Sequence, residues 1–486
     1  MGTYLGIDLG TSAIKAIIVA DSGEVLARAR AAHPASRRGL VGRVDPQAWA
    51  QSLFEACHHL GPALADVKGV GIDTHCPTVI PLGPQGTPVG LGITWDNPAL
   101  AKYFTRYSGR RSAAEIEATG NRPSPSTFMA IAHPFLKHEE PETFAAMTTL
   151  GLASTWLGQL LTGESAIDPT QASYMGVYHT TGSGLEWLPG ALDALEMDAD
   201  VLPAVREPIS ILGQITPGAA QLLGIPAGIP VSVGCADTPA ASYVLGTSPG
   251  TQPFLIIGTT HVVNSCLEGP DWRSLALQRR GLRPGEWLIN GVANGGDALA
   301  TGAHCYGFGE ADTAVRELIR CAAEVSPAEA AKAPFFVPHV MPERGPFWFD
   351  GPRSGMVGMN RNTTHAQVAH ALVEGVIFAD RMVLESTIPV GDEPIYLTGA
   401  FGVDRVIPQL LADATRRTFD LVVETDLPSL GAAGICAEAV AGTRLPAPTS
   451  TRTEPRPDRS DLDDERWEDW VRAWSQVTGA EPIASI

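Results

Sequence analysis

The sequence predicts an α/β fold built from a duplicated unit. Short apolar segments bounded by turn residues alternate with segments of helical periodicity in both halves of the 486-residue chain. This alternation favours mixed strands and helices over an all-β architecture. A strand–turn–strand pattern near the N-terminus also recurs roughly half a chain later. Internal repetition of a supersecondary unit is itself evidence about architecture.

The first copy of this pattern spans residues 4–19. Gly10, Thr11 and Ser12 form its turn, and Asp8 lies where the first strand ends. Glycine lets backbone N–H groups approach an anion because no Cβ intervenes, the hydroxyls add donors, and the carboxylate is a ligand for a divalent cation. These residues outline a nucleoside-triphosphate site. They are equally typical of an ordinary hairpin turn.

The second copy spans residues 253–264, with Gly258, Thr259 and Thr260 at its turn. It differs from the first copy in one respect, because Ile256 stands where the first copy has Asp8. We therefore expect two phosphate-binding hairpins to face one nucleotide, with the metal ion served from the first half only.

Composition limits the class of protein. Apolar content of 44% and charged content of 18% are typical of a globular protein, and the length of 486 residues favours two or more domains. No apolar run reaches the roughly 18 residues of a membrane span, and no signal peptide is expected. The net charge of −19 argues against binding to nucleic acid or anionic membranes. Seven scattered cysteines without a CxxC pair predict reduced thiols and a cytoplasmic location.

The expected elements follow the hydrophobic pattern. Strands are predicted in the first half at residues 4–9, 13–20, 24–30, 68–73 and 229–234, and helices at 45–60, 112–119 and 139–162. In the second half we expect a strand at 394–398 and helices at 310–324, 364–386, 404–415 and 430–441. Residues 443–463 have the composition of an exposed connector, and the tryptophans at 467–474 predict an amphipathic terminal helix docked on the body.

Asp237 is the candidate catalytic base. It follows the strand expected at 229–234 and precedes Thr238-Pro239, which opens a helix. Open α/β sheets bind ligands at the carboxyl ends of their strands, and a helix N-terminus stabilises negative charge. An ionised carboxylate beside a hydroxyl accepts its proton during phosphoryl transfer. The alternative is a carboxylate that assists a helix cap formed by Thr238.

Polar and aromatic residues after two further strands are candidates for a polyol site. His75 follows the strand that ends near Asp73, and Trp95-Asp96-Asn97 follows a shorter one. Sugars are often held by an aromatic face and by planar polar side chains. We assign Thr74, His75, Trp95, Asp96 and Asp237 to this site, although a lone His or Trp is more often structural.

Two glycine-containing segments remain. Gly399-Ala400-Phe401-Gly402 lies between a strand and a helix. Its glycines would let the backbone approach the base or ribose of a nucleotide. The alternative is a strand–helix connection that needs glycine only for its own geometry. Gly431-Ala-Ala-Gly434 opens the next helix, for which close packing is the preferred interpretation.

Taken in this order, the motifs resemble the FGGY family of sugar kinases, and most closely its xylulokinase-like branch, from about residue 3 to residue 442. Two segments resemble the family's phosphate motifs: Gly6-Ile-Asp8-Leu-Gly10-Thr11-Ser12 and Ile257-Gly258-Thr259-Thr260. The family's adenosine motif resembles Leu397-Thr-Gly399-Ala-Phe-Gly402. Its catalytic motif resembles Gly234-Cys-Ala-Asp237. The similarity of Glu343-Arg344 and Glu374-Gly375 is weaker.

The resemblance implies two actin-like, ribonuclease-H-like domains with the active site in the cleft between them. The expected boundaries are 1–245 for the first domain, 246–442 for the second, and 443–486 for a linker and terminal helix. The implied reaction moves the γ-phosphoryl group of ATP to a hydroxyl of a small sugar. Asp237 would accept the proton and Asp8 would hold Mg²⁺. The implied nucleotide contacts are Gly10, Thr11, Ser12, Lys15, Gly258, Thr259, Thr260, Gly399, Ala400, Phe401 and Gly402.

The chain departs from the family pattern at the sugar site. Asp73-Thr74-His75-Cys76 stands where xylulokinases usually have Gln-Met-His-Gly, and Trp95-Asp96-Asn97-Pro98-Ala99 stands where they have Trp-Asn-Asp-x-Arg. The expected substrate is therefore a ketopentose such as D-xylulose or a related sugar. The alternatives are a kinase for another polyol, a cyclitol or a non-sugar hydroxyl, and a nucleotide-gated sensor. A homodimer is compatible with the family.

Overall fold

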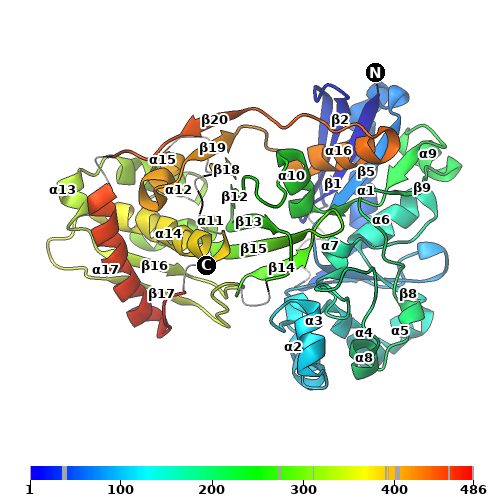
Figure 1. The fold of residues 1–486 in the computed structure, drawn as a ribbon, viewed down its shortest axis with the longest axis horizontal. Coiled ribbons are helices and arrows are strands. Elements are labelled where there is room, and N and C mark those ends of the chain that lie inside the picture. Colours follow the sequence, from blue (N-terminus) through cyan, green and yellow to red (C-terminus); the bar gives the residue numbers. More distant parts are fainter. Residues whose placement is uncertain are drawn as a thin grey trace.

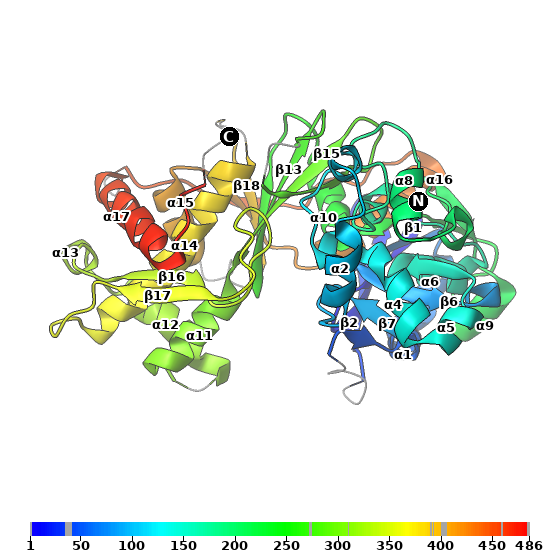
Figure 2. The same cartoon turned by 90° about the horizontal axis from the view of Figure 1, so that it is seen from below.

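The computed structural model describes residues 2–34, 41–271, 275–309, 311–388, 391, 393–399, 406–457 and 460–483. The chain forms two lobes, which lie side by side in both views (Figures 1 and 2). A seven-stranded mixed sheet lies at the centre of each lobe. Within the described residues, no helix is both long enough and apolar enough to cross a membrane.

The strands fall into two large and two small sheets. The first-lobe sheet contains β1 (Thr3–Leu9), β2 (Ala13–Ala20), β3 (Val25–Ala32), β5 (Gly69–Thr74), β9 (Ile211–Gln214), β10 (Pro230–Ser232) and β11 (Cys235–Ala236). The second-lobe sheet contains β12 (Phe254–Ile257), β13 (Thr260–Leu267), β14 (Leu277–Arg280), β15 (Trp287–Asn294), β18 (Ile395–Thr398), β19 (Phe419–Val422) and β20 (Ser450–Thr453). One small sheet contains β4 (Arg43–Val44), β6 (Thr78–Leu82), β7 (Gly92–Thr94) and β8 (Thr149–Leu152). The other contains β16 (Phe335–His339) and β17 (Arg353–Val357).

The helices cover these sheets. Those before residue 246 are α1 (Pro46–Leu60), α2 (Leu100–Ser108), α3 (Ala113–Thr119), α4 (Ala132–Glu139), α5 (Pro141–Ala146), α6 (Ala153–Thr162), α7 (Pro169–Ala172), α8 (Pro189–Ala194), α9 (Pro217–Leu223) and α10 (Asp237–Leu245). Those that follow are α11 (Gly296–Tyr306), α12 (Ala311–Ala323), α13 (Pro327–Ala330), α14 (His365–Thr387), α15 (Val406–Thr415), α16 (Leu427–Ala441) and α17 (Ser460–Thr478).

The two large sheets share one topology, which confirms the predicted duplication. The first contains the order β3-β2-β1-β5-β10, and the second contains the order β15-β13-β12-β18-β19. In both, the first three strands are antiparallel and the next two continue parallel. Each predicted glycine turn joins the second and third strands of its series, between β1 and β2 and between β12 and β13. The α/β prediction is also confirmed.

Helix α16 follows the second-lobe sheet in sequence but packs on the first-lobe sheet, beside β1, β5 and α10 (Figure 1). This packing needs glycine on both sides. A Cβ on Gly6 would lie 1.8 Å from the carbonyl oxygen of Ser429, and one on Gly71 would lie 1.8 Å from that of Ala432. On the helix itself, a Cβ on Gly431 would lie 1.9 Å from the carbonyl oxygen of Ala240 in α10. Close packing is thus confirmed as the role of Gly431.

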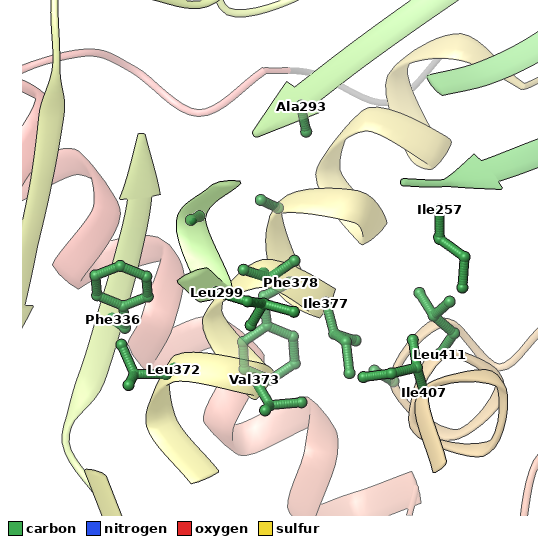
Figure 3. Packing of buried hydrophobic residues seen from close by; sticks show 14 of the residues in the cluster. Ile257, Ala293, Leu299, Phe336, Leu372, Val373, Ile377, Phe378, Ile407 and Leu411 are labelled. Carbon is green, nitrogen blue, oxygen red and sulfur yellow. The ribbon is translucent and has the colours of Figure 1, made fainter. Parts of the chain in front are cut away.

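The core of the second lobe is organised by α14, which is buried along most of its length. Its apolar side chains pack against those of α11 and α15, as Figure 3 shows for Phe378, Leu299 and Leu411. The expected terminal helix is present as α17. Its buried Trp470 and Trp474 donate hydrogen bonds of 2.7 Å to the carbonyl oxygen of Phe336 and to Nε2 of His339.

Two expectations about local structure are wrong. The predicted helix at 139–162 is interrupted by strand β8, because the short run Thr149–Leu152 pairs with β6. The segment 443–463 is not merely an exposed connector. Its residues Ser450–Thr453 form the edge strand β20 on β19, and Arg452 makes a two-point ion pair with Asp420. Tertiary pairing decides both cases, and composition gives no sign of it.

Replacing Gly71 by alanine tests the close approach of α16. The added Cβ would collide with backbone that cannot rotate away, so we expect Gly71→Ala to lower the free energy of unfolding by about 1–3 kcal/mol. Thermal unfolding of the ligand-free protein measures the change. The matched control is Gly218→Ala in α9, where a Cβ meets nothing within 4 Å. Equal melting temperatures for the two variants would contradict this account of the packing.

Candidate active site

Three carboxylates converge at one edge of the first-lobe sheet. Strands β1 and β5 are parallel neighbours that place Asp8 opposite Asp73. Strand β11 continues the parallel pairing with β5, and α10 begins directly after it at Asp237. Asp8 is 5% exposed and Asp73 is fully buried. The edge is the one where parallel strands end, as the sequence predicts for a ligand site.

Burial and mutual repulsion perturb two of these acids. Burial, opposed by Lys15 and reinforced by Asp237, raises the pKa of Asp8 to about 7. Burial, followed by the charges of Asp8 and Asp237, raises the pKa of Asp73 well above its usual value. A hydrogen bond between the two carboxyl groups also raises the pKa of Asp73 and lowers that of Asp8, so Asp73 is the acid that holds the proton. Acids held so far from their solution behaviour are typical of functional sites.

A pocket of about 280 Å³ opens beside these acids, between the two lobes. Its lining draws on motifs that are far apart in the sequence: Asp8, Gly10, Lys15, Asp237, Thr238, Ala241, Ile256, Thr398, Gly399, Thr425, Leu427 and Pro428. One space is therefore bordered by the first glycine turn, the strand that leads into the second turn, the candidate base and Gly399 of the predicted adenosine motif. Ala400, Phe401 and Gly402 lie outside the described residues.

The hairpin tips carry the remaining predicted phosphate contacts. Thr11, Ser12, Thr259 and Thr260 are exposed at these tips, and Gly258 is half-buried. Lys15 lies opposite Asp8 in the antiparallel register of β1 and β2, with its Nζ 3.4 Å from a carboxylate oxygen of Asp426. Of these residues, Lys15 lines the pocket, and the four hydroxyl side chains are exposed on the turns of the two hairpins.

Gly399 has two independent reasons to be glycine. Its φ is +114°, outside the range that other residues readily adopt, and a Cβ would lie 2.3 Å from the carbonyl oxygen of Ile257. The strand–helix connection therefore requires glycine at this position whether or not a nucleotide binds. Its place in the pocket lining agrees with the predicted nucleotide contact.

The predicted sugar residues lie around the same edge, but several are engaged within the protein. Both ring nitrogens of His75 have partners, the carbonyl oxygen of Leu9 at 2.9 Å and Oγ1 of Thr78 at 3.0 Å. Burial lowers the pKa of His75, and its ring packs edge-on against Trp49 at 5.3 Å. The hydroxyl of Thr74 is buried and donates to Gln171. These contacts give His75 and Thr74 rigid positions in the wall of the site.

The Trp95 segment is more open. Trp95 is 42% exposed, and the guanidinium carbon of Arg344, from the second lobe, lies 4.9 Å from the centre of its ring. Asp96 accepts a hydrogen bond from Thr94. Asn97, by contrast, is buried and binds the carbonyl oxygen of Gly42. Trp95 therefore presents a free face, whereas Asn97 supports the loop.

Sequence reasoning missed Arg279, which reaches the first lobe from strand β14. Its Nη2 donates to the hydroxyl of Tyr174 at 2.8 Å, and its guanidinium lies 4.3 Å from the centre of the Tyr174 ring. A signal was present, because Gln278, Arg279 and Arg280 give a strand three polar residues in a row. All three are buried. Arg344 was noted only as a weak similarity to the family.

Magnesium would fit the acids that are present. Within the part of the chain that the structure describes, no group of three or more His, Cys, Asp and Glu side chains could hold a metal ion. Protein sites for Mg²⁺ usually supply only one or two carboxylates and leave the other positions to water and substrate phosphates. Asp8, which lines the pocket, would be such a ligand.

Comparison with known proteins identifies the family. The model of the FGGY family of carbohydrate kinases, N-terminal domain, matches residues 3–244, and that of the C-terminal domain matches residues 255–440. The chain is 27% identical to a xylulose kinase of Escherichia coli strain K12 over 441 residues, 88% of each protein. It is 26% identical to a xylulose kinase of Streptomyces rubiginosus over 461 residues, 93% of this chain and 90% of the relative.

Solved structures agree on the fold. A xylulose kinase from Rhodospirillum rubrum superposes with a TM-score of 0.84 at 22% identity, and a Plasmodium falciparum glycerol kinase with ADP superposes with a TM-score of 0.77 at 18% identity. Each comparison covers 98% of both chains. The duplicated sheets, the pocket between the lobes and the two family matches lead to one conclusion: the chain belongs to the FGGY family of carbohydrate kinases, with its two-domain actin-like fold, and is an ATP-dependent sugar kinase.

Proposed function

We propose that this kinase transfers the γ-phosphoryl group of ATP to a hydroxyl of a small open-chain sugar, with a ketopentose such as D-xylulose as the leading candidate. One observation carries the proposal. A single pocket between the lobes is bordered by Gly10 of the first glycine turn, by Ile256 on the strand that leads into the second turn, by Asp8 and Lys15, and by Asp237. The relatives that match most of the chain are xylulose kinases, which supports the choice of sugar.

Asp237 would act as the base. It is the first residue of α10, where the free N–H groups of a helix stabilise negative charge. One carboxylate oxygen accepts a hydrogen bond of 2.6 Å from the backbone N–H of Thr238, which orients the group. The other oxygen has no hydrogen bond assigned among the described residues, so it is available to take the proton of an attacking hydroxyl.

The remaining groups position and neutralise the phosphates. Asp8 would hold Mg²⁺, which supplies charge neutralisation to the triphosphate when it is bound. Lys15 adds a positive charge from the neighbouring strand. The hydroxyls at the two hairpin tips would contact phosphate oxygens from opposite lobes, so closure of the lobes would exclude water from the transferred group. All seven cysteines are free, which fits a reducing compartment such as the cytoplasm.

Replacing Asp237 by asparagine removes the proton acceptor and keeps the shape of the side chain. We expect kcat with D-xylulose to fall by about 10²–10⁴-fold, because general base catalysis contributes that much. Affinity for ADP, measured by calorimetry, should stay within about threefold of the wild-type value. Turnover near the wild-type level in Asp237→Asn would show that another group accepts the proton.

The raised pKa of Asp8 predicts a pH-dependent stability in the ligand-free protein. An acid whose pKa is higher in the folded state stabilises that state at low pH, and this contribution is lost as the pH rises through about 7. Asp8→Asn should therefore melt above the wild type at pH 8 in the presence of a chelator, and the difference should shrink toward pH 5. The same variant should need more Mg²⁺ for half-maximal turnover. A difference in melting temperature that does not change with pH would contradict the raised pKa of Asp8.

A further inference from the structure

Arg279 is a buried cation with unfilled hydrogen-bonding capacity. It is 6% exposed, and every residue of its strand, Leu277–Arg280, is buried. Its Nη2 is bound to Tyr174, but within the described residues Nε and Nη1 have no hydrogen-bond partner. Leaving buried donors unpaired is costly, so such groups in a folded protein call for an explanation. A bound substrate would supply the missing acceptors.

The position of Arg279 is on the sugar side of the site. Strand β14 lies beside α7 of the first lobe, where the N–H of Arg280 donates to Ser173 at 3.0 Å. The guanidinium of Arg279 stacks on Tyr174, and the second arginine of this wall, Arg344, stacks on Trp95. None of these side chains belongs to the lining of the nucleotide pocket, whereas Asp237 does.

Asp237 connects the two parts of the site. Burial lowers the pKa of Arg344, whereas for Arg279 the effect of burial is outweighed by Tyr174, Cys76 and Asp237, so that the pKa of Arg279 is raised. Helix α7 packs against both β11, which leads directly into Asp237, and β14, which carries Arg279, so this helix joins the two parts of the proposed site. A substrate whose reacting hydroxyl contacts Asp237 would extend from there toward Arg279, away from the nucleotide.

Charge at this wall favours a neutral ligand. The charges of Arg279 and Arg344 and of two carboxylates, Asp168 and Asp237, all act on the pKa of the buried Cys76 thiol. Burial raises the pKa of Asp168 to about 6, against its hydrogen bonds to Thr170 and Gln171. The two arginines thus have carboxylates in their surroundings, and what Arg279 lacks is hydrogen-bond acceptors. A second anion would add repulsion from both carboxylates.

A guanidinium only donates hydrogen bonds, so its partner must be an acceptor. The carbonyl oxygen of a ketose accepts two hydrogen bonds and brings no hydrogen of its own, whereas the hydroxyl of the corresponding alditol brings a hydrogen that needs another acceptor. We propose that Arg279 is a specificity-determining residue that donates to the carbonyl oxygen of an open-chain ketose while a hydroxyl farther along the same molecule lies at Asp237. This inference rests on the proposed sugar kinase function.

The inference also accounts for a departure in the sequence. The family pattern that begins at Trp95 has an arginine at its fifth position, where this chain has Ala99. Arg279 and Arg344 bring guanidinium groups to the same wall from the opposite lobe. Substrate binding would then draw the second lobe toward the first and couple sugar recognition to closure.

The test compares a ketose with its reduced forms. We would measure kcat and KM for D-xylulose, xylitol and D-arabinitol with the wild type, Arg279→Gln and a control, Arg122→Gln. Arg122 is exposed and stacks on Trp348 at 5.4 Å. The wild type should prefer D-xylulose. Arg279→Gln should raise the KM for D-xylulose by about 10- to 150-fold, leave the KM for ATP unchanged, and reduce the preference for the ketose. The control should match the wild type.

A second variant guards against misfolding. Arg279→Ala removes the side chain, and added guanidinium ion should restore part of its turnover of D-xylulose if the lost group acts on the substrate. Three results would overturn the inference: a fall in kcat for all substrates with unchanged ketose preference, a wild-type preference for the alditols, or a wild-type preference for a sugar acid such as D-xylonate. Absence of any sugar-dependent ATP turnover in the wild type would instead refute the proposed function.

Discussion

The close approach of α16 to the first-lobe sheet is the constraint on which the active site depends. Backbone atoms of this helix contact β1 at Gly6, β5 at Gly71 and α10 at Ala240. These three elements carry Asp8, Asp73 and Asp237, so a single helix sets the mutual positions of the three acids. The first turn of the same helix also lines the nucleotide pocket. Because α16 follows the second-lobe sheet in sequence, it connects the two halves of the duplicated fold.

Electrostatics explains why this packing must be tight. Burying several carboxylates together is unfavourable, and the perturbed acids Asp8 and Asp73 show that cost in the ligand-free protein. A metal ion bound at Asp8 would offset this cost. Lys15 already opposes the rise in the pKa of both acids. The site is therefore organised for bound ligands at the expense of the stability of the free protein, which is typical of catalytic centres.

The sequence predicted those parts of the fold and site that depend on local pattern. The two glycine hairpins, the strand before Asp237 and the helices near residues 46, 365 and 427 all follow from turn chemistry and periodicity. The interruption of 139–162 by β8 and the edge strand β20 depend on pairing with distant segments. Arg279 was missed for the same reason. Its role depends on β14 reaching across to Tyr174, and a buried arginine inside a strand looks like a solvated one until its neighbours are known.

The central claim is that the paired hairpins hold a triphosphate directly beside Asp237. A crystal structure with Mg²⁺, a non-hydrolysable ATP analogue and D-xylulose would test it most directly. The account predicts phosphates between residues 10–12 and 258–260, the metal ion at Asp8, and a sugar hydroxyl within hydrogen-bond distance of Asp237. A nucleotide bound elsewhere, or an Asp237 carboxylate turned away from the sugar, would contradict it.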